Sequence, residues 1–139
     1  MGLKSLLSLP FARQIVKKNS KWKKNAVKVQ NTLLLSLVSQ AKNTKFGKDH
    51  NFSEISNYSD WKKNIPVRDY EELKIYVQEI IDGEKDVLWP GRPLYFCKTS
   101  GTTSGTKYIP ISKESMPHHI TAARDAILSY IAETKNTSI

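Results

Sequence analysis

A run of eight small residues places the strongest constraint on the fold of this 139-residue chain. Every residue from Thr99 to Thr106 is glycine, serine or threonine, and Lys107 follows directly. Leu94–Cys97 before the run and Tyr108–Ile111 after it are rich in aromatic and apolar residues, which predicts a buried strand on each side. The second strand contains a proline, which cannot donate a ladder hydrogen bond, so we expect it at a sheet edge or very short. The fold must therefore present a polar loop between two strands.

The chemistry of this loop predicts that it binds phosphate. Glycine lets the backbone approach a ligand closely, and successive backbone N–H groups can surround an anion. Hydroxyl groups add donors and the lysine adds a positive charge. A Walker P-loop is excluded, because Thr106 stands at its second glycine and Tyr108 at its Mg²⁺-binding hydroxyl. The candidate phosphate-binding residues are Thr99, Ser100, Gly101, Thr102, Thr103, Ser104, Gly105 and Lys107.

Positive charge is concentrated in the first half of the chain. Residues 1–63 hold 13 Lys and Arg against 3 Asp and Glu, whereas residues 64–139 hold 9 against 10. The basic segment 13–28, which contains Trp22, has the composition of a module that binds nucleic acid or anionic lipid. The more common arrangement is a solvated helix face, here anchored to the core by Trp22. We therefore expect no nucleic-acid or membrane partner, and keep the basic binding module as an alternative.

Composition excludes several classes of protein. The longest apolar run, at residues 33–38, is far shorter than the ~20 residues of a membrane-spanning helix. The single cysteine, Cys97, excludes an internal disulfide and a cysteine-based zinc cluster, and we expect it to pack in the strand. His118 and His119 are adjacent and point in different directions on a helix, so we expect no metal site built from side chains. A reduced, cytoplasmic protein is the expectation.

Residues 1–48 are expected to form a helical hairpin. Pro10 can open the first helix, because its missing N–H costs nothing in a first turn, and the helix would reach about Lys24. Asn25 is a suitable N-cap for the second helix, which Gly47 would end. The face of the second helix expected to be buried carries Val29, Leu33, Leu37 and Val38.

Three more helices are expected further along the chain. A short one covers residues 58–64. Asp69 and Glu72 have the spacing of a capping box for the next, which Gly83 ends. Its apolar face carries Leu73, Tyr76, Val77 and Ile80. Ser112 or Ser115 caps the last helix. Its expected inward face carries Ile120, Ala123, Ile127, Leu128 and Ile131.

The polar loop resembles the first nucleotide-binding motif of adenylate-forming enzymes, T-S-G-T-T-G-x-P-K. The spacing from Thr99 to Lys107 is kept, while Gly105 is shifted by one position and Thr106 replaces proline. With these departures, the chain resembles one branch of these enzymes, the Gretchen Hagen (auxin-responsive promoter) acyl acid-amido synthetases in their bacterial form. The resemblance covers essentially the whole chain. It extends to the segments Phe46–His50, Ile65–Tyr70, Val87–Gly91 and Tyr108–Ser112.

The resemblance implies a two-step ligase. In such enzymes a carboxylic acid reacts with ATP to give an acyl-adenylate and pyrophosphate, and the amine of an amino acid then displaces AMP to form an amide. The loop from Thr99 to Lys107 would hold the ATP phosphates, with Mg²⁺ bridging them. The last helix would line the acyl pocket. Arg124 is a candidate for binding the substrate carboxylate, although a surface salt bridge is the more common role.

The resemblance also implies an α/β fold that is incomplete in this chain. The helical hairpin would span residues 1–48, and the start of the nucleotide-binding domain residues 49–139. Family members run to several hundred residues and carry later motifs, so we expect the catalytic residues to lie outside this chain and the chain alone to be inactive. A ligase that transfers its acyl group to coenzyme A is the alternative. The sequence leaves open the acyl acid, the amine and the oligomeric state.

Overall fold

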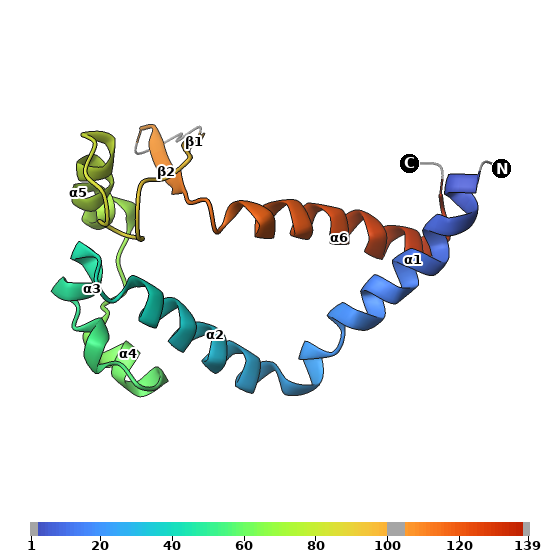
Figure 1. Cartoon of the computed structure of the whole chain (residues 1–139), viewed down its shortest axis with the longest axis horizontal. Coiled ribbons are helices and arrows are strands. Elements are labelled where there is room, and N and C mark those ends of the chain that lie inside the picture. Colours follow the sequence, from blue (N-terminus) through green and yellow to red (C-terminus); the bar gives the residue numbers. More distant parts are fainter. Residues whose placement is uncertain (1–2, 100–104, 138–139) are drawn as a thin grey trace. The chain divides into compact units, whose positions relative to one another are not determined.

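The computed structural model describes residues 3–99 and 105–137, with side chains from residue 8 onward. Helices dominate, and one two-stranded antiparallel sheet lies between the fifth and sixth α-helices in the chain order (Figure 1). The elements are α1 (Leu3–Asn19), η1 (Trp22–Asn25), α2 (Ala26–Ala41), α3 (Lys45–Asp49), η2 (Phe52–Glu54), α4 (Tyr58–Asn64), α5 (Tyr70–Ile81), β1 (Tyr95–Thr99), β2 (Lys107–Ile111) and α6 (Met116–Thr134).

Contacts within the chain divide it into two compact units. The first unit consists of residues 1–29 and 114–139, and the second of residues 30–113. The boundary that we expected after residue 48 stays a prediction. Among the described residues, no helix is long and apolar enough to cross a membrane.

The first unit is built on the packing of α1 against α6. Its core consists of Ala12, Leu128 and Ile131. Asn19, the last residue of α1, donates a 2.6 Å hydrogen bond from Nδ2 to Oδ2 of Asp125 in α6. The helix that α1 packs against therefore lies at the other end of the sequence, a pairing that the sequence pattern did not predict.

Several expectations about the long helices are wrong. Helix α1 begins at Leu3 and contains Pro10 in its interior, so proline does not open it. In α6, Leu128 and Ile131 are buried as expected, but Ile120 and Ile127 are exposed. In α2 only Val38 of the expected face is buried, while Val29, Leu33 and Leu37 are exposed. Helical spacing marks an apolar stripe, but burial also needs a neighbouring element over the whole stripe.

The core of the second unit consists of two apolar clusters that share Phe46. One cluster contains Val38, Ala41, Phe52 and Ile55, and the other contains Tyr76, Ile80 and Val87. The Phe46 ring packs edge-on against both Phe52 and Tyr76, with ring centroids 5.8 and 5.1 Å away. A single aromatic side chain from α3 thus joins the α2 side of this unit to the α5 side.

The turn between α2 and α3 corrects the expectation that Gly47 ends the second helix. Helix α2 already ends at Ala41, and Gly47 is buried inside α3. Thr44 is the N-cap of α3: its hydroxyl accepts from the Gly47 N–H at 3.0 Å and donates to the Ala41 carbonyl at 2.7 Å. A Cβ at Gly47 would lie 2.2 Å from that same carbonyl oxygen, so glycine is needed here for close packing.

Two predicted helices are confirmed. Helix α4 covers residues 58–64, as expected. At the start of α5, Asp69 Oδ1 accepts from the Glu72 N–H and Glu72 Oε2 accepts from the Asp69 N–H, each at 3.0 Å. This is the predicted capping box, and it satisfies two backbone donors that the helix leaves free. Helix α5 stops at Ile81, before Gly83, which has a φ of 102°.

Candidate functional site

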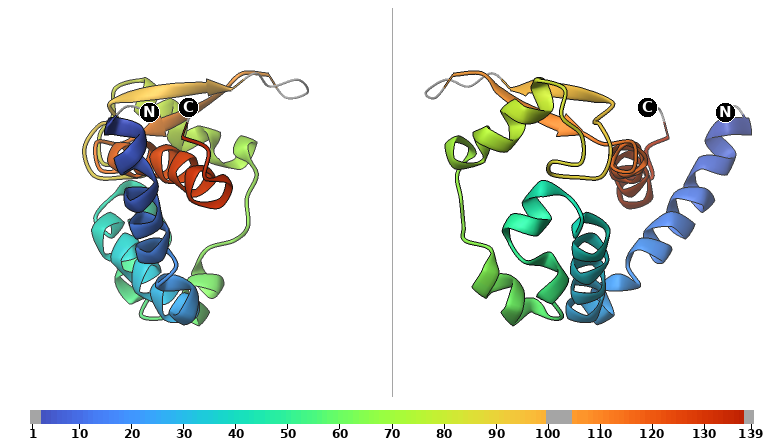
Figure 2. Two further views of the ribbon diagram at one scale, coloured as in Figure 1. Left: turned by 90° about the vertical axis from the view of Figure 1, so that its right-hand side faces the viewer. Right: turned by 60° about the vertical axis from the view of Figure 1, so that its left-hand side comes forward.

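The candidate site lies at the end of the hairpin formed by β1 and β2, which run side by side in both views of Figure 2. Thr99, the last residue of β1, pairs with Lys107, the first residue of β2. The predicted loop is therefore closed at its base by these two residues. Ser100, Gly101, Thr102, Thr103 and Ser104, which we assigned to nucleotide binding, lie outside the described residues.

The hairpin is more exposed than the sequence suggested. Cys97 was expected inside a buried strand, but it is exposed, as are most residues of β1. A two-stranded sheet has only one face that α5 can cover, and Phe96 is the β1 residue that packs into the Tyr76 cluster. The edge position expected for the second strand is confirmed, because both strands of this sheet are edges.

Gly105 lies where the backbone requires a glycine. Its φ is 79°, in the left-handed region that L-residues with a side chain rarely adopt. An added Cβ would meet nothing within 4 Å, so the requirement comes from backbone conformation and not from crowding. The turn leading into β2 thus depends on this glycine.

Lys107 carries the charge of the described part of the site. Its side chain is half-buried, and its Nζ lies 5.4 Å from the centroid of the Tyr70 ring. Across the described ranges, 3–99 and 105–137, no carboxylate forms a salt bridge with it. An ammonium group held against an aromatic face and unpaired with a carboxylate is available to an anionic ligand.

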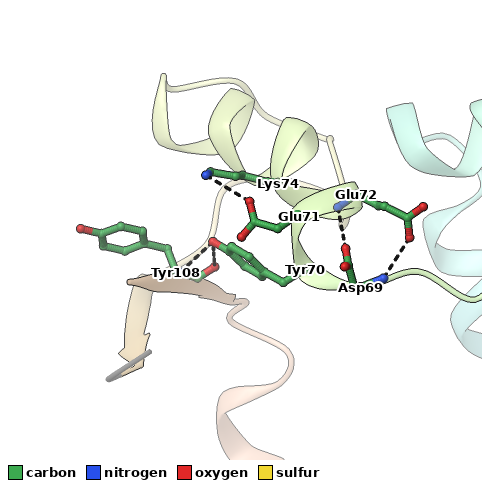
Figure 3. A network of polar contacts seen from close by, with 6 residues as sticks. All are labelled: Asp69, Tyr70, Glu71, Glu72, Lys74 and Tyr108. Carbon is green, nitrogen blue, oxygen red and sulfur yellow. Dashed lines mark hydrogen bonds and ion pairs between the residues drawn. The ribbon is translucent and has the colours of Figure 1, made fainter. Parts of the chain in front are cut away.

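Tyr70, the first residue of α5, is a site residue that the sequence analysis missed (Figure 3). Its hydroxyl accepts a 2.9 Å hydrogen bond from the Tyr108 N–H and lies 3.4 Å from the Tyr108 carbonyl oxygen. Tyr70 and Tyr108 are 38 positions apart, so no local pattern could reveal the contact. Two signals pointed to this residue: its position directly after the N-cap Asp69, and its place in the segment Ile65–Tyr70 that resembles the family.

A second polar cluster lies between α3 and α5. The Tyr76 hydroxyl donates a 2.9 Å hydrogen bond to Oδ2 of Asp49, and Lys45 forms a salt bridge with Glu79. Burial, followed by the bond to Asp49, raises the pKa of Tyr76 above its ordinary value. The hydrogen bond to Glu79 raises the pKa of Lys45. An open pocket of about 640 Å³ lies beside this cluster, lined in part by Lys48.

The remaining candidate residues lie elsewhere. Arg124, in α6, is paired with its neighbour: its Nη2 lies 2.7 Å from Asp125 Oδ1. The surface salt bridge is therefore present, and a role with a substrate carboxylate stays a prediction. Within the described part of the chain, no group of three or more His, Cys, Asp or Glu side chains is placed to hold a metal.

Comparison with known proteins identifies the family. Residues 15–138 match the model of the GH3 family N-terminal domain. The chain belongs to the GH3 family. Two curated relatives from Arabidopsis thaliana are similar to it. The probable indole-3-acetic acid-amido synthetase GH3.1 is 29% identical over 125 residues, and the indole-3-acetic acid-amido synthetase GH3.15 is 30% identical over 98 residues.

These GH3 relatives are amido synthetases several times longer than this chain. The matches cover 84% and 69% of the chain but only 21% and 16% of the two relatives. A solved structure, titled AtGH3.15 acyl acid amido synthetase in complex with 2,4-DB, matches 91% of the chain and 21% of its own length. The TM-score is 0.71 and the sequence identity 21%, so this match shows the fold alone. The expected fold class, the first part of this GH3 fold, is confirmed.

Proposed function

We propose that this chain is the N-terminal part of an ATP-dependent ligase that adenylates a carboxylic acid and joins it to an amino acid. The observation that carries the proposal is membership of the GH3 family over residues 15–138, a range that contains the whole polar loop. The similar curated proteins are named as synthetases that join indole-3-acetic acid in an amide. The acyl acid and the amine used by this chain remain open, and a cytoplasmic location stays a prediction.

In this proposal the loop from Thr99 to Lys107 binds the ATP phosphates. The described ends of the loop fit an anion: Lys107 offers an ammonium group without a carboxylate in salt-bridge range among the described residues, and Gly105 sets the turn that precedes it. When bound, ATP supplies the adenylyl group that activates the acid. The task of Lys107 is electrostatic, because negative charge builds on the departing pyrophosphate.

Among the described residues, no group of three or more His, Cys, Asp or Glu side chains is placed to hold Mg²⁺. We therefore propose that Mg²⁺ enters with the nucleotide, held mainly by phosphate oxygens. Mg²⁺ is commonly held in this way, with few protein ligands and several waters.

Phosphate binding is tested by titrating the chain with inorganic pyrophosphate and Mg²⁺ and following the amide resonances by NMR. We expect the Lys107→Gln variant to bind at least about tenfold more weakly, the loss expected for one hydrogen bond to a charged group. Lys98→Gln is the matched control, because Lys98 lies in the same hairpin opposite Tyr108 and its replacement removes the same charge. Equal weakening in both variants, or no binding by the wild-type chain, would contradict the proposed role of the loop.

Turnover is tested by acid-dependent exchange of labelled pyrophosphate into ATP. We propose that residues 1–139 alone support no exchange, because they correspond to only about a fifth of the relatives. Exchange above background with the isolated chain would disprove this inactivity. A ligase that transfers the acyl group to coenzyme A is the closest alternative, and in an active, longer form of the protein the acceptor would be identified by comparing amino acids with coenzyme A.

A second candidate function rests on the basic segment 13–28. Trp22 does not anchor this segment in the core as expected: its side chain is 50% exposed, and Val27 is 72% exposed. Exposed apolar side chains among lysines are typical of segments that lie on anionic lipid surfaces. Vesicle sedimentation and DNA titration at two salt concentrations test this candidate. Loss of all binding near physiological salt would remove it.

A further inference from the structure

The phenol of Tyr70 contacts two neighbouring residues of β2, Lys107 and Tyr108, and Figure 3 shows the contact with Tyr108. Its hydroxyl accepts from the backbone N–H of Tyr108 at 2.9 Å, while its ring lies 5.4 Å from Nζ of Lys107. The hydrogen bond at Tyr108 holds the backbone of β2 beside α5, and the ring contact sets the direction of the Lys107 side chain at the end of the loop.

The start of α5 holds Tyr70 in place. Tyr70 directly follows the N-cap Asp69. The Asp69 carboxylate accepts a hydrogen bond from the Glu72 N–H, and the Glu72 carboxylate accepts one from the Asp69 N–H. Such a capping box stops the first turn of a helix from fraying. The ring that faces Lys107 is therefore carried by a rigid element outside the hairpin.

Lys107 gains orientation from this contact. A lysine side chain has many rotamers and no planar geometry to restrict them, so ordering it on a ligand costs conformational entropy. Its contact with the Tyr70 face restricts those rotamers before a ligand binds, and it leaves the ammonium unpaired with any described carboxylate. Preorganisation of this kind strengthens binding without adding a contact to the ligand.

We propose that Tyr70 is a positioning residue of the phosphate-binding loop: it acts through Lys107, whose ammonium it directs, while its hydrogen bond with the Tyr108 N–H holds the Tyr70 ring beside that lysine. The inference rests on the proposed function, in which Lys107 binds nucleotide phosphate. It assigns to the first residue of α5 a role in the affinity of a loop that follows about 30 positions later in the sequence.

A double-mutant cycle tests this role, with inorganic pyrophosphate and Mg²⁺ as the probe and NMR titration as the readout. We expect Tyr70→Leu to weaken binding about threefold to tenfold, which corresponds to the entropic cost of ordering one flexible side chain on the ligand. In a Lys107→Met background we expect Tyr70→Leu to have no further effect. Tyr70→Phe keeps the ring and loses the hydroxyl, so it should keep most of the affinity while the Tyr108 amide exchanges faster with solvent.

Tyr58→Leu is the matched control, because Tyr58 is also the first residue of a helix and has the ammonium of Lys62 5.9 Å from its ring. It should leave binding unchanged. Unchanged binding of Tyr70→Leu beside a binding wild-type chain would overturn the role of Tyr70 alone. Equal losses in both Lys107 backgrounds would show a merely structural effect and overturn it too. A wild-type chain that does not bind pyrophosphate would overturn the proposed function and this inference together.

A measurement on the wild-type chain covers the case in which Tyr70→Leu does not fold. Protons above an aromatic face resonate upfield, so the ε-methylene protons of Lys107 should be shifted upfield relative to those of Lys98 in the same hairpin. Identical shifts for the two lysines would contradict the contact on which the inference depends.

Discussion

Tyr76 donates a 2.9 Å hydrogen bond to Asp49 and thereby links α5 to the end of α3, 27 positions earlier in the sequence. The Tyr76 side chain is 5% exposed, and its ring packs edge-on against Phe46. One residue thus contributes both apolar packing and a polar bond to the same interface between helices. The Phe46–His50 and Ile65–Tyr70 segments, which resemble the family, meet here too: Arg68 lies 6.0 Å from the Phe46 ring.

Replacing Tyr76 by phenylalanine should lower the free energy of unfolding by about 1 kcal/mol, the usual net value of one hydrogen bond. The ring and its packing against Phe46 are kept, so the loss reports on the hydroxyl. Urea unfolding followed by circular dichroism measures the change. Tyr58→Phe is the control, because Tyr58 is 58% exposed, and it should change stability by less than about 0.5 kcal/mol. Equal losses in the two variants would contradict the prediction.

The stability of the second unit should decrease at alkaline pH because of Tyr76. Burial and the bond to Asp49 raise its pKa in the folded state above the unfolded value of about 10. The neutral phenol therefore contributes stability that is fully present below pH ~10 and is lost as the pH rises through the folded-state pKa. The difference in stability between wild type and Tyr76→Phe should shrink from neutral pH to about pH 11. A constant difference would exclude this linkage.

Gly47→Ala should destabilise the turn between α2 and α3 by about 1–3 kcal/mol, the usual cost of overpacking. The new Cβ would lie 2.2 Å from the Ala41 carbonyl oxygen, and backbone must move to admit it. Gly83→Ala is a control without crowding, because an added Cβ there meets nothing within 4 Å and only the positive φ opposes it. Thermal unfolding compares the two. A larger loss at Gly83 than at Gly47 would show that backbone conformation outweighs the close approach.

The first unit should lose stability in acid through Asp125. Hydrogen bonds from Asn19 and then from Arg124 hold the pKa of Asp125 below its usual value. A lowered folded-state pKa means that the contribution is present above pH ~4 and is lost as the pH falls through the folded-state value. Asp125→Asn should therefore be less stable than wild type at neutral pH and approach it near pH 2–3.

Thermal unfolding at the two pH values measures this effect. Glu133→Gln is the control, because it removes one carboxylate from an exposed position of the same helix. It should follow the wild-type pH profile. Parallel profiles for Asp125→Asn and wild type would contradict the prediction.

Local sequence signals predicted the elements that local forces determine. The capping box at Asp69 and Glu72 marks the start of α5, and Gly83, two positions after Ile81, follows its end. The buried residues of α5 follow the predicted stripe. The two strands around the polar loop were also predicted, although the first begins and ends slightly later than expected. In each case the deciding interactions lie within a few residues of one another.

Expectations based on burial succeeded only where a second element covers the predicted face. Leu33 and Leu37 follow a helical stripe and are exposed, and Cys97 is exposed in a strand that reads as apolar. Gly47 resembles a helix terminator, but it is buried inside α3, where an added Cβ would lie 2.2 Å from the Ala41 carbonyl oxygen. Burial of a face depends on which distant segment packs against it, and the periodicity of apolar residues does not identify that segment.

The sequence by itself determined the family, the strand–loop–strand order and the chemistry of the Gly/Ser/Thr loop with Lys107, because these depend on residue type and short spacing. Only the tertiary structure decided that Tyr70 contacts Lys107 and Tyr108, that Tyr76 bonds to Asp49, and that α1 packs on α6. These contacts join residues far apart in the sequence. They form only when the intervening loops close and bring distant apolar surfaces together. A local sequence pattern does not specify which distant surfaces meet.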